Sequence, residues 1–296
     1  MTGHGPYLGM IRRWHWLILS VCCLSSPAVF GGTFLCAVSS ASGLSLTYDP
    51  ASPAQTLGMG TAAITCTKSG GNLATVYYEL GTNGGINVSG AQSRAVSGAF
   101  QINYNTWSDS ARSLVWNDIA SGRVKGSITS ASSSTVYLNY YVSIPNAQNV
   151  SLGTYLDTQT IKLYQGASAI AASTDISPTV QTFGMAFAVA AKCSLSSTPG
   201  DVNFNYTSFQ TAASLASTSF AVTCVDNTSY TMALDANSGT LLGLTYTLSL
   251  SKSGTQTGNG FAQSASIQGS MPAGQSGTCN GAACQGSEAR TLTISY

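Results

Sequence analysis

Residues that can carry acid–base or nucleophilic chemistry are scarce in this sequence. Its two histidines, His4 and His15, both lie within the first 31 residues, which have the features of a removable leader. The rest of the chain therefore has no imidazole for a Ser-His-Asp or Cys-His catalytic group, for a metal site or for a pH switch. This absence argues against an enzyme.

Two acidic features imitate functional sites but lack essential parts. Asp109 and Asp118 could form a pair of carboxyl groups, which glycosidases hold about 5–10 Å apart, but both flank turn-like stretches. The segment 235–239 begins like a calcium loop, yet no glutamate follows at the position that such a loop requires. We therefore expect no catalytic residue, no metal site and no cofactor.

Six of the eight cysteines lie beyond the leader, and their spacing recurs: Cys36, Cys66, Cys193, Cys224, Cys279 and Cys284. Six cysteines allow 15 pairings. However, the first two are 30 positions apart and the next two are 31 apart, which suggests one bridge in each of two repeats and a small local loop closed by the last two. A zinc site would need closely spaced cysteine pairs, and only the last pair comes near that spacing. We predict disulfides, and hence an oxidising compartment.

The leader itself, residues 1–31, resembles a signal peptide. Arg12 and Arg13 precede an apolar run at 14–24, and Ser26-Pro27-Ala28 offers a small-residue cleavage site. A membrane anchor is the alternative, but the run is shorter than the ~20 residues that a bilayer requires. The sequence therefore predicts export through the inner membrane.

The composition describes a folded chain with little charge. Charged residues make up 7% of the sequence, against about 25% in a typical soluble domain. The hydrophobic fraction of 44% excludes disorder, because disordered chains are poor in apolar residues. A formal net charge of +1 provides no electrostatic surface for nucleic acid.

An internal repeat divides the chain after the leader. Residues 144–148 (Ile-Pro-Asn-Ala-Gln) match residues 271–275 (Met-Pro-Ala-Gly-Gln), and each half ends on an alternating run. Short stretches that alternate apolar and polar residues, with Gly, Asn and Ser between them, are typical of β-strands. We predict an all-β protein with two immunoglobulin-like sandwich domains, at 32–165 and 193–296, joined by a linker at 166–192. A barrel is the alternative.

The ordered set of these motifs resembles the spore coat protein U domain family. The first half carries Tyr104, Asp109, Trp116, the 144–148 motif and residues 153–158; the second carries residues 199–201, 271–275 and 291–296. The resemblance implies a secreted subunit of archaic chaperone–usher pili, with a sandwich that lacks one strand and is completed by a strand from a neighbour. It also implies three partners: a periplasmic pilus chaperone, an outer-membrane usher and an adjacent pilin subunit. The second half departs from the pattern, since it has no tryptophan and adds the Cys279–Cys284 loop.

A segment in the predicted linker has the character of a donor strand. Its alternate residues are large and apolar: Phe183, Met185, Phe187 and Val189. An extended segment of this kind can fill a sheet groove by strand addition. We expect it to complete the first domain within the same chain; the alternative is an ordinary first strand of the second domain.

The two ends of the exported chain suggest its place in a pilus. If cleavage follows Ala28, at most seven residues precede Cys36, too few for a donor strand that advances ~3.3 Å per residue. This predicts a two-domain tip subunit, with an adhesin domain followed by a pilin-like domain that lacks one strand. At the other end, Leu292, Ile294 and Tyr296 alternate as a strand that a chaperone would bind, or as the last core strand.

The sequence therefore predicts a non-enzymatic tip adhesin that is displayed on the cell surface or secreted and acts in surface attachment and biofilm formation. The alternatives are a structural shaft pilin, a secreted coat protein and a hydrolase on a β scaffold. Residues 50–60 and 84–100 are the expected exposed loops of the first domain. Their apolar residues could bind a hydrophobic surface or could instead belong to the core. Trp107 or Trp116 could line a glycan pocket, although the family resemblance implies that Trp116 is structural.

Overall fold

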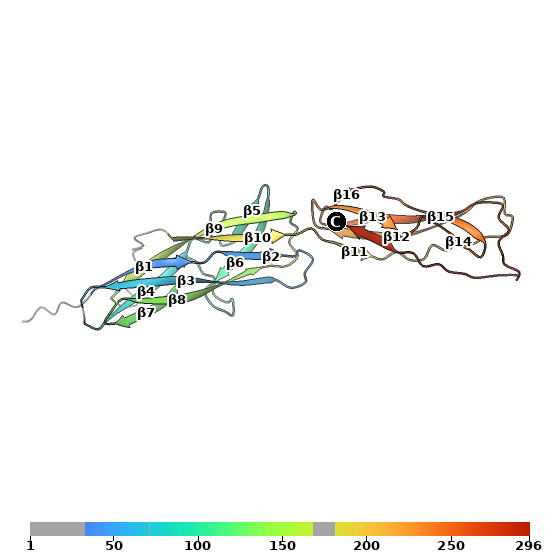
Figure 1. Ribbon diagram of the computed structural model, residues 1–296. Coiled ribbons are helices and arrows are strands. Elements are labelled where there is room, and N and C mark those ends of the chain that lie inside the picture. Colours follow the sequence, from blue (N-terminus) through green and yellow to red (C-terminus); the bar gives the residue numbers. More distant parts are fainter. Residues whose placement is uncertain (1–32, 71, 168–180) are drawn as a thin grey trace, which may run out of the picture. The chain divides into compact units, whose positions relative to one another are not determined.

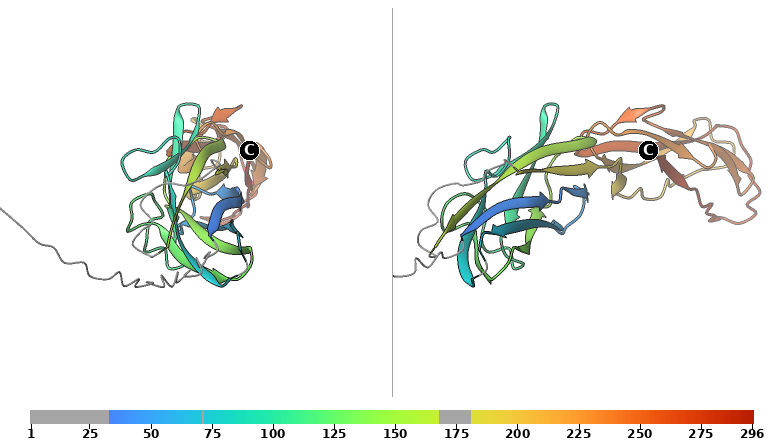
Figure 2. Two further views of the ribbon diagram at one scale, coloured as in Figure 1. Left: turned by 90° about the vertical axis from the view of Figure 1, so that its left-hand side faces the viewer. Right: turned by 60° about the vertical axis from the view of Figure 1, so that its left-hand side comes forward.

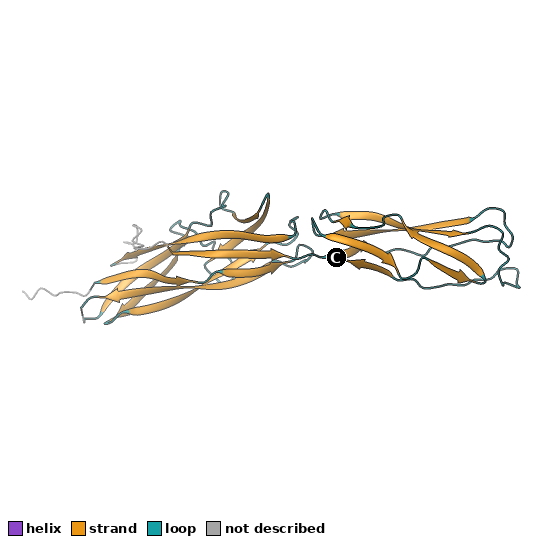
Figure 3. Cartoon of the chain, turned by 45° about the horizontal axis from the view of Figure 1, so that its top comes forward, coloured by secondary structure: helices purple, strands orange, loops and turns teal. Residues whose placement is uncertain are grey.

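The computed structural model describes residues 33–70, 72–167 and 181–296. The predicted signal peptide at 1–31 and much of the predicted linker lie outside the described residues. Within these ranges the chain forms strands and loops (Figure 3). They contain no helix, and hence none that could span a bilayer. The predicted all-β fold is confirmed.

Ten strands build the first domain (Figure 1): β1 (Phe34–Ala41), β2 (Leu44–Tyr48), β3 (Thr56–Lys68), β4 (Ala74–Thr82), β5 (Ser93–Ser97), β6 (Phe100–Trp107), β7 (Val124–Ser130), β8 (Ser134–Ile144), β9 (Gly153–Gly166) and β10 (Gln181–Val189). One layer has the order β1-β3-β8-β6 and the other the order β2-β10-β9-β4-β7. These orders match the A-B-E-D and G-F-C sheets of an immunoglobulin-like sandwich. β5 pairs with both β6 and β9 and so links the two layers.

Alternation along the strands places the core between the layers. On β9, Tyr155, Ile161 and Leu163 are buried, whereas Leu156 points outward and is 56% exposed. A glycine is required at Gly60 of β3, because a Cβ there would lie 2.2 Å from Cζ of the Tyr140 ring. The sequence therefore fixes which face of each strand is buried.

The second domain has eight strands: β11 (Cys193–Ser197), β12 (Ser214–Cys224), β13 (Ser229–Leu234), β14 (Ser238–Leu241), β15 (Leu244–Leu250), β16 (Gln256–Thr257), β17 (Ala262–Met271) and β18 (Leu292–Ser295). Its larger sheet has the order β11-β12-β17-β15-β14 and its smaller sheet the order β16-β13-β18. The larger sheet corresponds to A-B-E-D, and β13 and β18 correspond to C and F. Among the described residues, no strand of this domain corresponds to β10.

The predicted repeat has a structural basis in two glutamines. The Gln148 side chain donates to the carbonyl oxygen of Asn103 (2.9 Å) and accepts from its backbone N–H (2.8 Å). Gln275 makes the same pair of bonds with Thr245, at 3.0 and 2.7 Å. Each glutamine thus fastens a loop to the backbone of the strand beside it, and Asn103 and Thr245 occupy equivalent positions.

The same motif contacts a tyrosine in each domain. The hydroxyl of Tyr48 accepts from the Gln148 N–H and that of Tyr206 from the Gln275 N–H, both at 2.9 Å. The residue before each glutamine has a left-handed backbone, with φ of 57° at Ala147 and 79° at Gly274. The two halves therefore correspond residue by residue around this loop.

The six cysteines beyond the predicted leader form three disulfides. Cys36 is bonded to Cys66, which lies opposite it on β3, and Cys193 to Cys224, which lies opposite it on β12. The third disulfide, Cys279–Cys284, closes a short loop between β17 and β18. The first two therefore join β1 to β3 and β11 to β12, the A and B strands of their domains.

Candidate functional site

The segment 181–189 forms a strand inside the first domain. As β10, it pairs antiparallel with β9, from Gln181 opposite Ile161 to Val189 opposite Gly153. On its other side it pairs in parallel with β2 (Figures 1 and 2). β10 therefore separates two strands that would otherwise expose their edges to each other across a groove.

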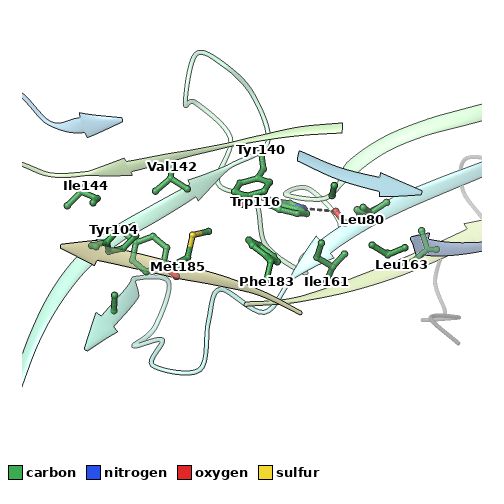
Figure 4. Packing of buried hydrophobic residues seen from close by; sticks show 14 of the residues in the cluster. Leu80, Tyr104, Trp116, Tyr140, Val142, Ile144, Ile161, Leu163, Phe183 and Met185 are labelled. Atoms are coloured by element: carbon green, nitrogen blue, oxygen red, sulfur yellow. Dashed lines mark hydrogen bonds between the residues drawn. The ribbon is translucent and has the colours of Figure 1, made fainter. Parts of the chain in front are cut away.

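The alternate side chains of β10 fill this groove. Four of them are at most 3% exposed: Phe183, Met185, Phe187 and Val189. The Phe183 ring lies 6.0 Å from the ring of Trp116 and 5.0 Å from that of Tyr140, centre to centre (Figure 4). β10 therefore belongs to the core of the first domain.

A buried set of polar side chains lies beside β10, and sequence reasoning missed it. The Tyr104 hydroxyl donates to Asp157 Oδ2 (2.6 Å) and accepts from Gln159 Nε2 (3.0 Å). Gln159 also donates to Thr106 Oγ1 (2.8 Å) and accepts from Thr82 Oγ1 (3.0 Å). Burial, followed by the hydrogen bond to Asp157, raises the pKa of Tyr104, so this hydroxyl remains a donor. The signal was available: Asp157 and Gln159 are polar residues at inward positions of an alternating strand.

The corresponding place in the second domain is open. Among residues 33–70, 72–167 and 181–296, β18 pairs with β13 only. Beside it, the segments 199–204 and 286–290 line a cavity of about 450 Å³, whose walls also include Leu234, Leu248, Ile267 and Leu292. By the repeat, this is the groove that β10 fills in the first domain.

The predicted C-terminal strand forms one edge of the small sheet. Leu292 and Ile294 lie opposite Leu234 and Met232 of β13 and pack against the second core. Tyr296 follows the strand and is 60% exposed. The alternating residues thus point toward the domain but are only half-buried.

The two aspartates considered as a catalytic pair have structural partners. Asp109 accepts hydrogen bonds from the backbone N–H groups of Leu114 and Ser113, and these bonds hold its pKa below the usual range. Asp118 accepts from Lys162 Nζ and the Tyr164 hydroxyl, both at 2.7 Å. Burial acts to raise the pKa of Asp118, but these bonds keep it lowered. Both carboxylates fasten loops. No cluster of three metal-ligating side chains occurs in the described part of the chain.

The expected loop at 50–60 is shorter than the sequence suggested. β3 begins at Thr56, so Leu57 and Met59 are outward residues of a strand. Gly58 and Gly60 obscured the pattern, because a glycine at an inward position gives no apolar signal. Gly58 has no room for a side chain, since a Cβ there would lie 2.7 Å from Leu44 Cδ2. By contrast, Ile86 and Val88 do lie in an exposed loop, between β4 and β5.

The two tryptophans of the first domain differ in their surroundings. Trp116 is buried, and its Nε1 donates to the carbonyl oxygen of Leu80 (2.9 Å; Figure 4). Trp107 is half-buried at the end of β6, where its Nε1 donates to Ser143 Oγ (2.8 Å). Trp116 therefore belongs to the core and has no free face for a glycan.

Comparison with solved structures finds adhesive subunits. The chain is similar to the CsuC–CsuE chaperone–tip adhesion subunit pre-assembly complex from the archaic chaperone–usher Csu pili of Acinetobacter baumannii. The identity is 14% and the TM-score 0.49, over 88% of this chain and 100% of that chain. It is also similar to the CupB6 tip adhesin from Pseudomonas aeruginosa, with 10% identity and a TM-score of 0.37 over 89% and 94% of the two chains.

Sequence comparison identifies the family. No match was found among curated proteins. The family model of the spore coat protein U domain matches residues 31–162 and, a second time, residues 179–257. These two matches cover most of the chain and follow the internal repeat. The chain belongs to the spore coat protein U domain family.

Proposed function

We propose that this protein is the non-enzymatic tip adhesin of a chaperone–usher pilus. One observation carries the proposal: two homologous domains of one chain contain the same groove, filled by β10 in the first and open in the second. A domain with a filled groove needs no further strand. A domain with an open groove can accept one, because β18 offers an unpaired edge beside an apolar wall.

The open groove accounts for the proposed partners. Leu292 and Ile294 are half-buried next to an unpaired strand edge, a surface that favours aggregation. A periplasmic chaperone that adds a strand there would protect the subunit after export through the inner membrane. An outer-membrane usher would then exchange the chaperone for the donor strand of an adjacent pilin subunit. The protein would finally be displayed on the cell surface.

The filled groove accounts for the position at the tip. Since β10 is part of the first core, it is not available to complete a neighbour. The chain would therefore accept a strand through its second domain and present its first domain outward. Exposed apolar side chains in the loops of that domain, including Ile86 and Ile119, would contact a surface and support attachment and biofilm formation.

A pull-down with the cognate periplasmic chaperone tests the assembly route. Leu292→Asp introduces a charge at the open groove and is expected to abolish the chaperone complex. Leu156→Asp, on the outward face of β9 in the closed first domain, is the matched control and should leave the complex intact. If Leu292→Asp still forms the complex, the proposal fails.

Two further measurements separate the tip adhesin from a shaft pilin or coat protein. Immunogold labelling of the first domain should mark pilus ends, whereas a shaft subunit would be labelled along the whole fibre. Ile86→Asp should reduce attachment of the cells to a hydrophobic surface at an unchanged number of pili. Full attachment by this variant would exclude the loop between β4 and β5 as a binding site.

A further inference from the structure

A cluster of three side chains lies in the open groove of the second domain. The Tyr246 hydroxyl donates to Glu288 Oε2 (2.7 Å), and Arg290 Nη2 lies 2.7 Å from Glu288 Oε1. The guanidinium carbon of Arg290 lies 5.6 Å from the centre of the Tyr246 ring. Gly239 makes room for this arrangement, because a Cβ there would lie 2.4 Å from Arg290 Nη2.

The first domain contains a related cluster in the same place. Because Asn103 and Thr245 bind equivalent glutamines, the next residues, Tyr104 and Tyr246, are equivalent as well. Tyr104 donates to Asp157, as Tyr246 does to Glu288. Each domain thus has a tyrosine–carboxylate hydrogen bond beside the groove, and in the first domain this bond is buried.

Strand register shows which part of an incoming strand would meet the cluster. Leu163 lies opposite Leu80 in the first domain, and Leu292 lies opposite Leu234 in the second. Ile161 lies two residues before Leu163, and Arg290 lies two residues before Leu292. Since Ile161 pairs with Gln181, the first residue of β10, Arg290 should face the first residue of an incoming strand.

The chemistry of Arg290 indicates what this first residue must be. Its side chain is 19% exposed, and within the described residues its Nε is buried without a hydrogen-bond partner. A strand with a large apolar residue there would remove the remaining solvent from the guanidinium and would offer Nε no partner, which is unfavourable. A strand with an acceptor side chain would satisfy it.

We propose that Arg290 and Glu288 form a polar subsite that selects the strand entering the second domain. This inference rests on the proposed function, because it assumes that a strand enters the groove. The preferred ligand is an extended peptide whose first inward residue accepts a hydrogen bond, such as Gln, Asn or Asp. Its later inward residues are apolar, to pack on the wall that includes Val202 and Phe204.

Peptide binding to the exported full chain tests the subsite. The probes are two labelled peptides that copy residues 181–189 and carry two added lysines at the C-terminal end, one with the native Gln at the first position and one with Leu. Fluorescence anisotropy should show about tenfold tighter binding of the Gln peptide, the ratio expected for a hydrogen bond to a charged group. In Arg290→Leu the preference should disappear. Lys252→Leu, which removes a positive charge outside the groove, should retain it.

The possible results distinguish this inference from the proposed function. Equal affinities of the two peptides for the unchanged chain would leave the groove as a strand site but overturn the polar subsite. Binding of neither peptide would overturn both, because the groove would then not accept a strand of this kind. The comparison of peptides on the unchanged chain needs no protein substitution, so it remains decisive even if Arg290→Leu does not fold.

Discussion

Removing one side chain of β10 measures how much this strand stabilises the first domain. Phe183 is 3% exposed and packs against the rings of Trp116 and Tyr140. Burial of a phenylalanine side chain contributes about 1.5–3 kcal/mol, and an aromatic pair adds about 0.5–1.5 kcal/mol. With the cavity that would remain, Phe183→Ala should lower the free energy of unfolding of the first domain by about 3–5 kcal/mol.

The tryptophans provide an assay that reports on this domain alone. In the chain without residues 1–31, the only tryptophans are Trp107 and Trp116, both in the first domain. Their fluorescence during urea unfolding therefore follows the first domain even when the second unfolds separately. The matched control is Leu156→Ala, since Leu156 lies opposite Ala186 of β10 but points outward.

The two variants should differ clearly. Leu156→Ala should change the free energy of unfolding by less than about 0.5 kcal/mol, as is usual for surface positions. If Phe183→Ala also costs less than about 1 kcal/mol, well below the range for a buried phenylalanine, β10 does not complete the first core in solution. The explanation of the filled groove would then be wrong.

Four further substitutions test the loops. Ala147→Gly relieves a left-handed backbone that costs about 1–2 kcal/mol but makes the unfolded chain more flexible, so it should stabilise the first domain by about 0.5–1 kcal/mol. Gly274 has the same left-handed backbone, so Gly274→Ala should destabilise the second domain by a similar amount. Hydrogen exchange of that domain measures this change. Gln148→Ala leaves two backbone groups without their partner and should cost the first domain about 1–3 kcal/mol in tryptophan-detected unfolding; an unchanged value would show that water replaces the side chain. Because the pKa of Asp118 is lowered in the folded state, its contribution to stability is present above the ordinary Asp pKa of about 3.9 and is lost as the pH falls through the folded value. Asp118→Asn should therefore destabilise the domain at pH about 7 but much less at pH about 2, and an equal loss at both pH values would contradict this account.

The sequence predicted the features that depend on local pattern. Alternation alone identified Phe183 and Met185 as residues of one strand face, because side chains on a strand alternate between its two faces. Leu57 and Met59 were misplaced, since the glycines that follow them carry no apolar signal. Those glycines are inward residues whose place is filled by side chains from elsewhere, such as Leu44 and Tyr140.

Alternation marks Asp157 and Gln159 as inward polar residues, but it does not identify the partners in the polar clusters beside the two grooves. Asp157 and Glu288 meet their partners, Tyr104 and Tyr246, only when segments distant in the chain come together. A single sequence contains no pairing information of that kind. The equivalence of Tyr104 and Tyr246 becomes visible only in the structure, where each follows a residue whose backbone a glutamine binds.

The pairing of β10 also determines how the first domain bears tension. Three residues separate β10 from β11, so a pull transmitted through the second domain enters the first domain at Val189. β10 is hydrogen-bonded to β9 on one side and to β2 on the other, and the pull acts along its own axis. Tension therefore shears both ladders at once and cannot open them one hydrogen bond at a time. For an anchored protein under flow, lifetime is set by the rate of unfolding, and this geometry places a strand that is hydrogen-bonded on both sides directly in the path of the load.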